Sequence, residues 1–191
     1  DLGCSEERKR AFDECVQKLG GRLDILVTAH GIQRRHPSEE FPMEDWEQVL
    51  GVNLTAVFEL CQLAANQFFS QKSKGKIITV SSMLSFFGGY TVPAYAASKG
   101  GVAQLTKALG NEWAGKGICV NSLAPGYMAT DMNTALLDPD NPRKKEITDR
   151  IPAGRWGTGE DMKGPCIFLA SDASDYLSGA VIPVDGGYLV R

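Results

Sequence analysis

The chain has 191 residues, of which 43% are hydrophobic and 23% charged, and its formal net charge at pH 7 is −3. This length is that of one domain with a core of its own, and the charge provides no large basic surface for nucleic acid or an anionic membrane. No uninterrupted apolar run approaches the roughly 18 residues that cross a bilayer, and the amino end, DLGCSEERKR, does not have the pattern of a signal peptide.

The five cysteines, Cys4, Cys15, Cys61, Cys119 and Cys166, show neither CxxC nor paired-ligand spacing. This usage favours reduced, mostly buried thiols in a cytoplasmic protein. It gives no support to a metal site, and the sequence has no HExxH motif either.

The first predicted element is a helix that starts at Ser5, which can cap it ahead of Glu6 and Glu7. Gly20 and Gly21 end that helix. The run 23–28 that follows is almost entirely apolar, which is typical of a parallel strand covered on both faces. Further apolar strands are predicted at KIITVS, ICVNSLA and AVIPVDGG, each separated from the next by helical patterns. This alternation predicts an α/β fold, a doubly wound parallel sheet in three layers that binds ligands at the carboxyl ends of its strands.

A long helical pattern runs from Glu44 to about Ser70, and Asn53 lies inside it. Asparagine is a poor residue for a helix interior, because its side chain competes for backbone hydrogen bonds. A lone asparagine inside a helix is unremarkable by itself, so any role for Asn53 rests on its place in the motif VNLTAVF.

The stretch Val80–Gly101 combines the end of a strand, a loop with two glycines and a helix that Pro93 can open. Tyr95 and Lys99 are at i and i+4 on that helix, so they share one face. An ammonium group beside a phenol favours the phenolate, and we expect it to lower the pKa of Tyr95 from its usual value of about 10. Ser82 precedes the glycine loop, and its hydroxyl could reach the same substrate oxygen as the phenol.

The order of Asn53 in VNLTAVF, Ser82 after a strand, PAYAASK and NSLAPG resembles the short-chain dehydrogenase/reductase family over essentially the whole chain. The resemblance implies a Rossmann-like sheet and hydride transfer between a nicotinamide cofactor and a secondary alcohol or ketone. In that family pattern Tyr95 is the acid–base group and Ser82 holds the substrate oxygen. Lys99 lowers the pKa of the tyrosine and binds ribose hydroxyls, and Asn53 bends its helix so that a backbone carbonyl holds a relay water.

No TGxxxGxG or GxGxxG turn follows a strand near the start of the chain, although the chain has 21 glycines. Against the family pattern, the first two strands and the phosphate-binding turn are absent. We therefore expect the natural protein to be longer and residues 1–191 to be a single domain that is incomplete at its amino end. The run 23–28 would then be an exposed sheet edge, and the 191-residue chain should bind cofactor weakly or not at all.

The resemblance also implies a set of cofactor contacts. The family's NNAG sequence is replaced here by Thr28-Ala29-His30-Gly31, in which His30 stands where the family has alanine. Its ring needs room and a hydrogen-bond partner, and bracing the strand end is the favoured role over catalysis. The cofactor-binding residues expected from the resemblance are Asp1, Leu2, Ala29, His30, Gly31, Tyr95, Lys99, Pro125, Gly126, Met128 and Thr130. The cofactor is expected to be NAD, with NADP as the alternative.

Arg34 and Arg35 follow the first strand. Such a pair is either a solvated loop feature or the source of a guanidinium that pairs with a substrate carboxylate. The strings IQRR, SSMLSFFGG and DRIPAGRWG are similar to the branch of 2-deoxy-D-gluconate 3-dehydrogenases and keto-deoxy-sugar-acid dehydrogenases. The expected substrate is thus a deoxy sugar acid such as 2-deoxy-D-gluconate, and segment 126–157 is expected to cover it as a lid. The substrate-binding residues expected are Arg34, Arg35, Ser82, Met83 and Tyr127.

Three alternatives stay open at this point. The chain could be a catalytically silent relative that serves as an oligomeric binding module, or a reductase of 3-oxoacyl or steroid-like ketones. A hydrolase is less well supported, because there is no GxSxG motif and only His30 and His36 could act as a base. By resemblance, the two long helices pair with a second copy, and their surplus apolar residues, including Leu105, Leu109 and Trp113, predict a dimer or tetramer.

Overall fold

The computed structural model describes residues 1–191, and its centre is one sheet of four parallel strands in the order β1-β2-β3-β4. The strands are β1 (Ile25–Thr28), β2 (Gly75–Val80), β3 (Ile118–Pro125) and β4 (Val181–Val184). In the register of the sheet, Leu26 lies opposite Ile77, and Ile77 opposite Val120. Because all four strands are parallel, their carboxyl ends meet at one edge of the sheet.

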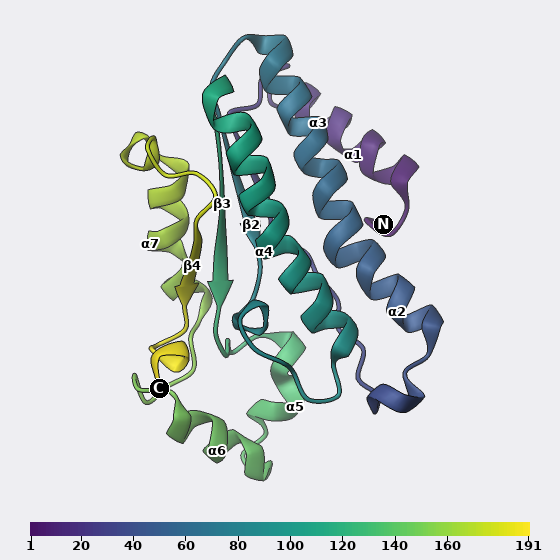
Figure 1. Ribbon diagram of the computed structural model, residues 1–191, viewed down its shortest axis with the longest axis vertical. Coiled ribbons are helices and arrows are strands. Elements are labelled where there is room, and N and C mark those ends of the chain that lie inside the picture. The colour runs from purple at the N-terminus through teal and green to yellow at the C-terminus, as the bar shows by residue number, and fades with distance from the viewer.

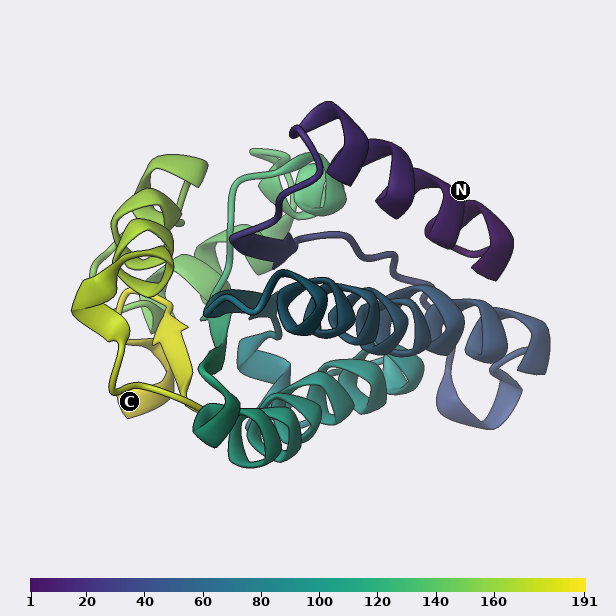
Figure 2. The same ribbon diagram turned by 90° about the horizontal axis from the view of Figure 1, so that it is seen from above.

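Helices cover the two faces of this sheet (Figure 1, Figure 2). They are α1 (Ser5–Lys18), α2 (Met43–Leu50), α3 (Ala56–Gln71), α4 (Pro93–Trp113), α5 (Thr134–Leu137), α6 (Pro142–Arg150) and α7 (Gly159–Ala170). Figure 2 shows α3 and α4 side by side on one face and α7 on the other, while α1 packs against α3. Figure 1 shows α5 and α6 beyond the end to which the β3 arrow points. This arrangement confirms the predicted α/β, doubly wound fold class.

The core divides into two layers because neighbouring strand residues point to opposite faces. Ile77 and Val120 belong to the main cluster with Phe68 of α3, and all three side chains are fully buried. Ile78 points the other way and packs with Leu169 of α7. The main cluster also takes in Leu109 and Trp113.

Several expectations on burial were wrong. Leu109 and Trp113 are 5% and 7% exposed, so this chain's own core occupies them and they offer no surplus apolar surface to a second copy. Strand β1 is an edge strand of the sheet, and Ile25 and Val27 are 42% and 43% exposed. This confirms the expected exposed edge at 23–28 and contradicts a strand covered on both faces. All five cysteines are free, as expected, but only Cys61 is buried.

The amino-terminal helix begins differently from the prediction. Cys4 occupies the N-cap position without a side-chain cap, and Ser5 is the first helical residue. The Ser5 hydroxyl instead donates to Glu59 Oε2 of α3 at 3.0 Å, beside an ion pair in which Arg8 Nε lies 2.7 Å from the same oxygen. A long-range polar contact has therefore replaced the local cap. Gly20 ends the helix as predicted, with a φ of 78° that glycine tolerates.

The predicted long helix is continuous over Met43–Gln71 and contains one π-helical turn, Gly51–Thr55, between α2 and α3. It is the one helix in the structure whose length and composition would allow it to cross a membrane, whereas the sequence showed no uninterrupted apolar run of that length. Core helices meet the same criterion, and the α3 residues Val57, Cys61 and Phe68 are buried in the main cluster.

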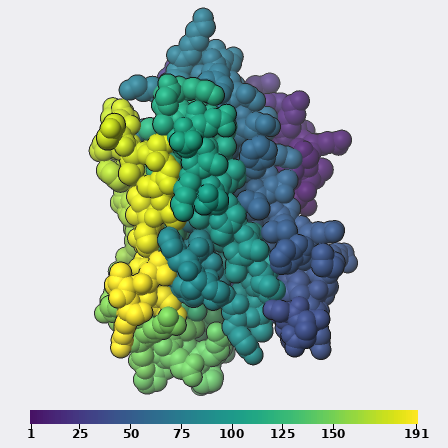
Figure 3. Space-filling model, viewed as in Figure 1, coloured from purple at the N-terminus to yellow at the C-terminus, as the bar shows by residue number.

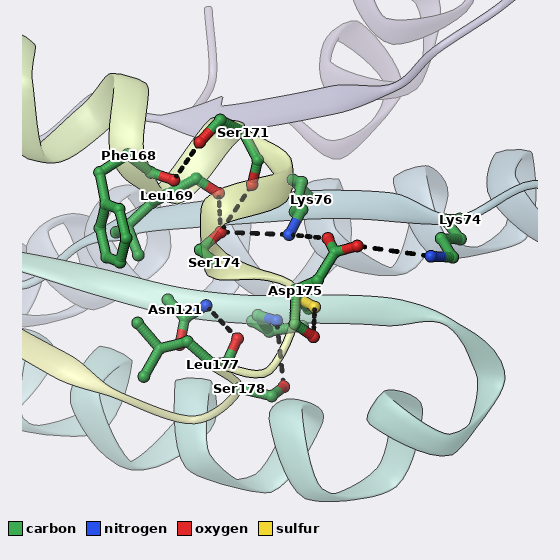
Figure 4. Close-up of polar contacts among 12 residues, drawn as sticks. Lys74, Lys76, Asn121, Phe168, Leu169, Ser171, Ser174, Asp175, Leu177 and Ser178 are labelled. Atoms are coloured by element: carbon green, nitrogen blue, oxygen red, sulfur yellow. Dashed lines mark hydrogen bonds and ion pairs between the residues drawn. The ribbon is translucent and has the colours of Figure 1, made fainter.

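A polar network lies at the end of the sheet where β2 and β3 begin, opposite to the carboxyl ends of the strands (Figure 4). The buried Lys76 donates from Nζ to Asp175 Oδ1 at 2.7 Å and to Ser174 Oγ at 3.1 Å. Asn121 donates to the Leu177 carbonyl at 2.7 Å. These contacts fasten the segment after α7 to the middle strands, and they lie away from the carboxyl ends where a ligand is expected.

Candidate active site

A cavity of about 340 Å³, which we call the main cavity, opens at the carboxyl ends of the strands. Ser82, two residues after the end of β2, and Tyr95, in the first turn of α4, both line it. Pro93 is at the start of α4, as predicted, because it lacks the backbone N–H that the first turn leaves unpaired. The Ser82 hydroxyl accepts a hydrogen bond from the Leu84 backbone N–H at 3.1 Å, which fixes the serine at the cavity wall.

Lys99 lies one helical turn after Tyr95, with its Nζ 5.8 Å from the centroid of the tyrosine ring. It is 3% exposed, and its Nζ donates to the Val80 carbonyl at the end of β2 at 2.7 Å. Burial lowers the pKa of Lys99 from 10.5 to about 8, because removal from water disfavours the charged form. The amine is thus close to the range in which it can lose its proton.

The pKa of Tyr95 does not follow the expectation. Burial raises it, and a hydrogen bond with the Ser82 side chain acts in the opposite direction without cancelling the effect. The physical reason is that desolvation penalises the phenolate, while the Lys99 ammonium is engaged by the Val80 carbonyl. In this structure the tyrosine is therefore a neutral proton donor.

Asn53 lies inside the π-helical turn and is completely buried. Its side-chain amide accepts from the Ile32 backbone N–H at 2.8 Å and donates to the Ile32 carbonyl at 2.9 Å. It also donates to Ser98 Oγ of α4 at 3.1 Å. These three bonds join the π-helical turn to the segment after β1 and to α4.

The structure brings Asn53, Ser82, Tyr95 and Lys99 into one neighbourhood from three separate parts of the chain. Gly31 completes it, because a Cβ atom at this glycine would lie 3.4 Å from Asn53 Oδ1 and 3.6 Å from Lys99 Nζ. The absence of a side chain at Gly31 therefore leaves the buried amine approachable from the end of β1.

His30 sits beside this group with one of its two ring nitrogens satisfied. The ring forms a hydrogen bond to the Val52 backbone, whereas Nε2 is buried without a partner. Burial and, next, the positive charge of Lys99 lower the pKa of His30. The hydroxyl of Thr28, two residues earlier, is also buried without a partner.

The residues at the end of β1 fit the sugar of a dinucleotide cofactor. The unpaired atoms Thr28 Oγ1 and His30 Nε2 offer hydrogen bonds, and Gly31 permits the close approach described above. Burying unpaired polar atoms costs free energy, so a ligand with hydroxyl groups would be favoured here.

The other expected cofactor residues are spread over three places. Asp1 and Leu2 precede α1, where the Leu2 carbonyl accepts a hydrogen bond from Arg8. Ala29 and Thr130 are exposed. Pro125 ends β3, Gly126 lines the main cavity, and Met128 lines a second cavity of about 180 Å³ beside it.

The side chains of the adjacent residues Arg34 and Arg35 point to different parts of the structure. Arg35 lines the main cavity, where its Nη1 donates to Thr91 Oγ1 at 2.9 Å and to the Tyr90 carbonyl at 3.1 Å. Arg34 does not line it, because its side chain turns to Asp45, with 3.5 Å between Nε and Oδ1. The structure therefore supports Arg35 over Arg34 as a residue of this cavity, and the assignment of Arg34 to the substrate site stays a prediction. Met83 and Tyr127, which we also expected there, do line the cavity.

The sequence reasoning missed α6 as a source of cavity residues. Arg143, Glu146, Ile147 and Arg150 all line the cavity. Their spacing, i, i+3, i+4 and i+7, is that of one helix face. Asn141 before Pro142 was a usable signal for the start of this helix, since the Asn141 side chain accepts from the Arg143 backbone N–H at 3.0 Å.

The comparisons with known proteins agree with this geometry. The family model described as enoyl-(acyl carrier protein) reductase matches residues 1–189. The 2-dehydro-3-deoxy-D-gluconate 5-dehydrogenase of Dickeya dadantii is 53% identical over 171 residues, which cover 90% of this chain and 67% of that protein. The protein of the same name from Escherichia coli is 53% identical over 180 residues, covering 94% of this chain and 70% of that protein.

Among solved structures, a gluconate 5-dehydrogenase from Burkholderia cenocepacia in complex with NADP and tartrate matches with a TM-score of 0.94 and 41% sequence identity. The match covers 100% of this chain and 74% of that one. The chain thus spans about two thirds of the length of the curated relatives that it matches, 67% and 70% in the two given above.

Proposed function

This chain belongs to the short-chain dehydrogenase/reductase family, and on that basis we propose that it transfers a hydride between NAD(P) and a secondary alcohol or ketone of a small sugar acid. The observation that carries the proposal is a shared cavity. Ser82 and Tyr95, which can handle the reacting oxygen and its proton, line the same cavity as Arg35, which can pair with a carboxylate. A substrate that is both a polyol and an anion needs both kinds of group.

In the proposed reaction Ser82 donates a hydrogen bond to the substrate oxygen and holds it beside the phenol of Tyr95. The Tyr95 hydroxyl protonates that oxygen in the direction of ketone reduction and accepts the proton back in the direction of alcohol oxidation. When bound, the nicotinamide supplies the hydride acceptor or donor.

Lys99 and Asn53 support this proton transfer from behind the tyrosine. We assign to Lys99 the binding of ribose hydroxyls and the electrostatic stabilisation of the phenolate once substrate excludes water. Its proximity to the Tyr95 ring, 5.8 Å from Nζ to the centroid, supports that role. Asn53 holds the π-turn in place through Ile32, and the bend would leave a backbone carbonyl free to hold a relay water.

The substrate class follows from charge. Three arginines and one glutamate line the cavity, which favours an anionic polyol over the apolar 3-oxoacyl or steroid-like ketones left open by the sequence. The relatives named for 2-dehydro-3-deoxy-D-gluconate and gluconate support a six-carbon acid, and 2-deoxy-D-gluconate is the candidate that the sequence itself indicated. The order of testing is therefore deoxygluconates first and gluconate second.

The proposal also includes the expectations on domain organisation, on the substrate lid and on the assembly of the protein. Residues 1–191 form one domain of this family, with 126–157 as its substrate lid, and the protein assembles as a dimer or tetramer. Figure 3 shows the outer side of α4 at the centre of one face of the molecule, between α3 and the carboxyl-terminal segment. Exposed apolar side chains support such an assembly, among them Phe58, Phe69, Ile167 and Phe168.

The test is an absorbance assay at the band of the reduced nicotinamide, with the intact gene product as the enzyme. 2-Deoxy-D-gluconate, 2-dehydro-3-deoxy-D-gluconate and D-gluconate are each offered with NAD and with NADP, because the resemblance indicates NAD whereas one related structure contains NADP. D-Glucitol serves as the uncharged comparison. Turnover of at least one acid, well above that of glucitol, is expected. Turnover of 3-oxoacyl or steroid ketones with none of any sugar acid would contradict the proposal.

A further inference from the structure

Helix α6 presents one face to the main cavity, and that face carries charge on both sides of an apolar anchor. Ile147 is 6% exposed and packs in a cluster with Ile151, Trp156 and Tyr188. Arg143 lies one turn before this anchor, and Arg150 nearly one turn after it. The buried isoleucine therefore fixes which side of the helix faces the ligand, and Arg143 shares that side.

Two arginines from distant parts of the chain converge on this cavity. Arg35 and Arg143 line the same cavity. In agreement with that placement, partial burial and, next, the positive charge of Arg143 lower the pKa of Arg35. None of the ion pairs in the structure involves Arg35, Arg143 or Arg150. Like charges brought together without an acidic partner are unfavourable, and a bound anion would relieve that cost.

The three cavity arginines are not equally free. Arg35 is anchored by its bonds to Tyr90 and Thr91. Arg150 lies over the ring of Tyr188, 4.5 Å from its centroid, a cation–π contact that engages the face of its guanidinium. The side chain of Arg143 makes no hydrogen bond or ion pair within the protein. The side chain of Arg150 makes none either, so the N–H donors of both are unpaired, but only Arg143 is also free of a contact with an aromatic ring.

The acidic residue on the same helix face does not neutralise this cluster. Glu146 lines the cavity but forms no ion pair with any of the arginines. The ionisable side chains that line the cavity therefore leave it positive, with three arginines against one glutamate. The glutamate adds an acceptor for a ligand hydroxyl, so the same face suits a molecule with one carboxylate and several hydroxyl groups.

We propose that Arg143 of the lid helix α6 and Arg35 after β1 together bind the carboxylate of the substrate. This inference rests on the proposed function, which it deepens by naming the residue that selects acids over neutral polyols. Arg143 is a substrate-binding residue outside the family's catalytic set. Because α6 lies within 126–157 and Arg35 follows the sheet, a carboxylate held by both ties the lid to the body of the domain.

Direct binding tests this proposal without any need for turnover. Calorimetry measures the affinity of the unaltered chain for D-gluconate and for D-glucitol, which keeps the hydroxyl chain and lacks the carboxylate. Arg143→Met should weaken gluconate about tenfold or more, the effect of losing a charge-assisted hydrogen bond, and should leave glucitol unchanged. Arg143→Lys, which keeps the charge but loses the fork, should fall between the two.

Lys145→Met is the matched control. Lys145 is on the same helix, but its side chain is 82% exposed and pairs with Asp149. The substitution removes one positive charge, as Arg143→Met does, yet it should change neither affinity. Equal losses of gluconate affinity in the Lys145 and Arg143 variants would overturn the proposal, and so would equal affinity of the unaltered chain for gluconate and glucitol. Circular dichroism checks that the variants are folded.

The outcome separates this inference from the proposed function. The protein could oxidise sugar acids, and the Arg143→Met and Arg143→Lys variants could prefer them over glucitol as strongly as the unaltered protein does. That result would overturn the role of Arg143 and leave the proposed function standing. Arg143-dependent binding of gluconate by a protein that turns over no sugar acid supports the carboxylate site and overturns the function.

Discussion

Lys99 Nζ donates a hydrogen bond to the Val80 carbonyl at 2.7 Å, which joins the second turn of α4 to the carboxyl end of β2. The same amine lies 5.8 Å from the centroid of the Tyr95 ring. A single buried lysine therefore links the strand end that carries Ser82 to the proposed proton donor. Its burial costs free energy, and that cost makes the first prediction measurable.

The stability of the protein should depend on the protonation of Lys99. Its pKa is lowered from 10.5 to about 8 in the folded state, so between these values the unfolded chain binds more protons than the folded one. The free energy of unfolding should therefore rise with pH from about 8 to about 10.5, by an upper limit of about 3 kcal/mol. Urea titrations of the unaltered chain and of Lys99→Met across this range measure the difference. Parallel pH profiles would contradict it.

Removal of one hydroxyl at Tyr95 should abolish most catalysis without loss of the fold. Tyr95→Phe keeps the ring but removes the proton that the substrate oxygen needs, so kcat should fall by about 100-fold or more. The control is Tyr176→Phe, because Tyr176 is fully exposed and its hydroxyl has no contact to lose. A kcat for Tyr95→Phe within twofold to threefold of the unaltered enzyme would reject the assignment of the proton donor.

The adjacent arginines should differ in their effect on substrate binding. Arg35→Met removes a cavity cation and should raise KM for a sugar acid by about tenfold. Arg34→Met breaks the contact with Asp45 and a hydrogen bond to the Gln33 carbonyl. Exposed ion pairs contribute little and Arg34 does not line the cavity, so KM should hardly change. Steady-state kinetics with 2-deoxy-D-gluconate compare the two. A larger rise in KM for the Arg34 variant would support the assignment of Arg34 to the substrate site.

Gly75 at the start of β2 should not tolerate a methyl group. A Cβ atom there would overlap the ring of Phe68, which is fully buried and has no room to move. Gly75→Ala should therefore lower the free energy of unfolding by about 1–3 kcal/mol. Gly115→Ala is the control, since nothing lies within 4 Å of the added atom. Equal midpoints of thermal unfolding for the two variants would show that the packing described here is wrong.

The network at the far end of the sheet should be important for stability and not for catalysis. Asp175→Asn removes the carboxylate that pairs with the buried Lys76 and should cost about 1–3 kcal/mol, because the ammonium loses its charged partner. The double variant Lys76→Met with Asp175→Asn should recover part of that loss, since it removes the buried charge as well. Chemical denaturation of the single and double variants measures the coupling between Lys76 and Asp175. A loss of stability in the double variant equal to the sum of the losses in the single variants would argue against it.

Predictions that rest on a local sequence pattern were confirmed where the structure of the segment depends mainly on its own residues. The apolar runs predicted all four strands, and β2 and β3, which are buried along almost their whole length, are apolar for the reason expected of a strand covered on both faces. Pro93 and Gly20 were correct boundary signals, because each restricts or permits particular backbone angles irrespective of what packs around it. The cap at Ser5 was wrong, since its hydroxyl found a stronger acceptor in Glu59, far away in the sequence.

The spacing of Tyr95 and Lys99 on one helix, and the order of the motifs around them, determined the family, the fold class and the candidate catalytic group from the sequence alone. Only the tertiary structure decided that Arg35 faces the cavity while Arg34 turns to Asp45, and that Arg143 lines the same cavity as Arg35. It also decided that burial raises the pKa of Tyr95. The reason is that periodicity specifies which face of an element is apolar, whereas distances and desolvation between elements depend on how those faces pack.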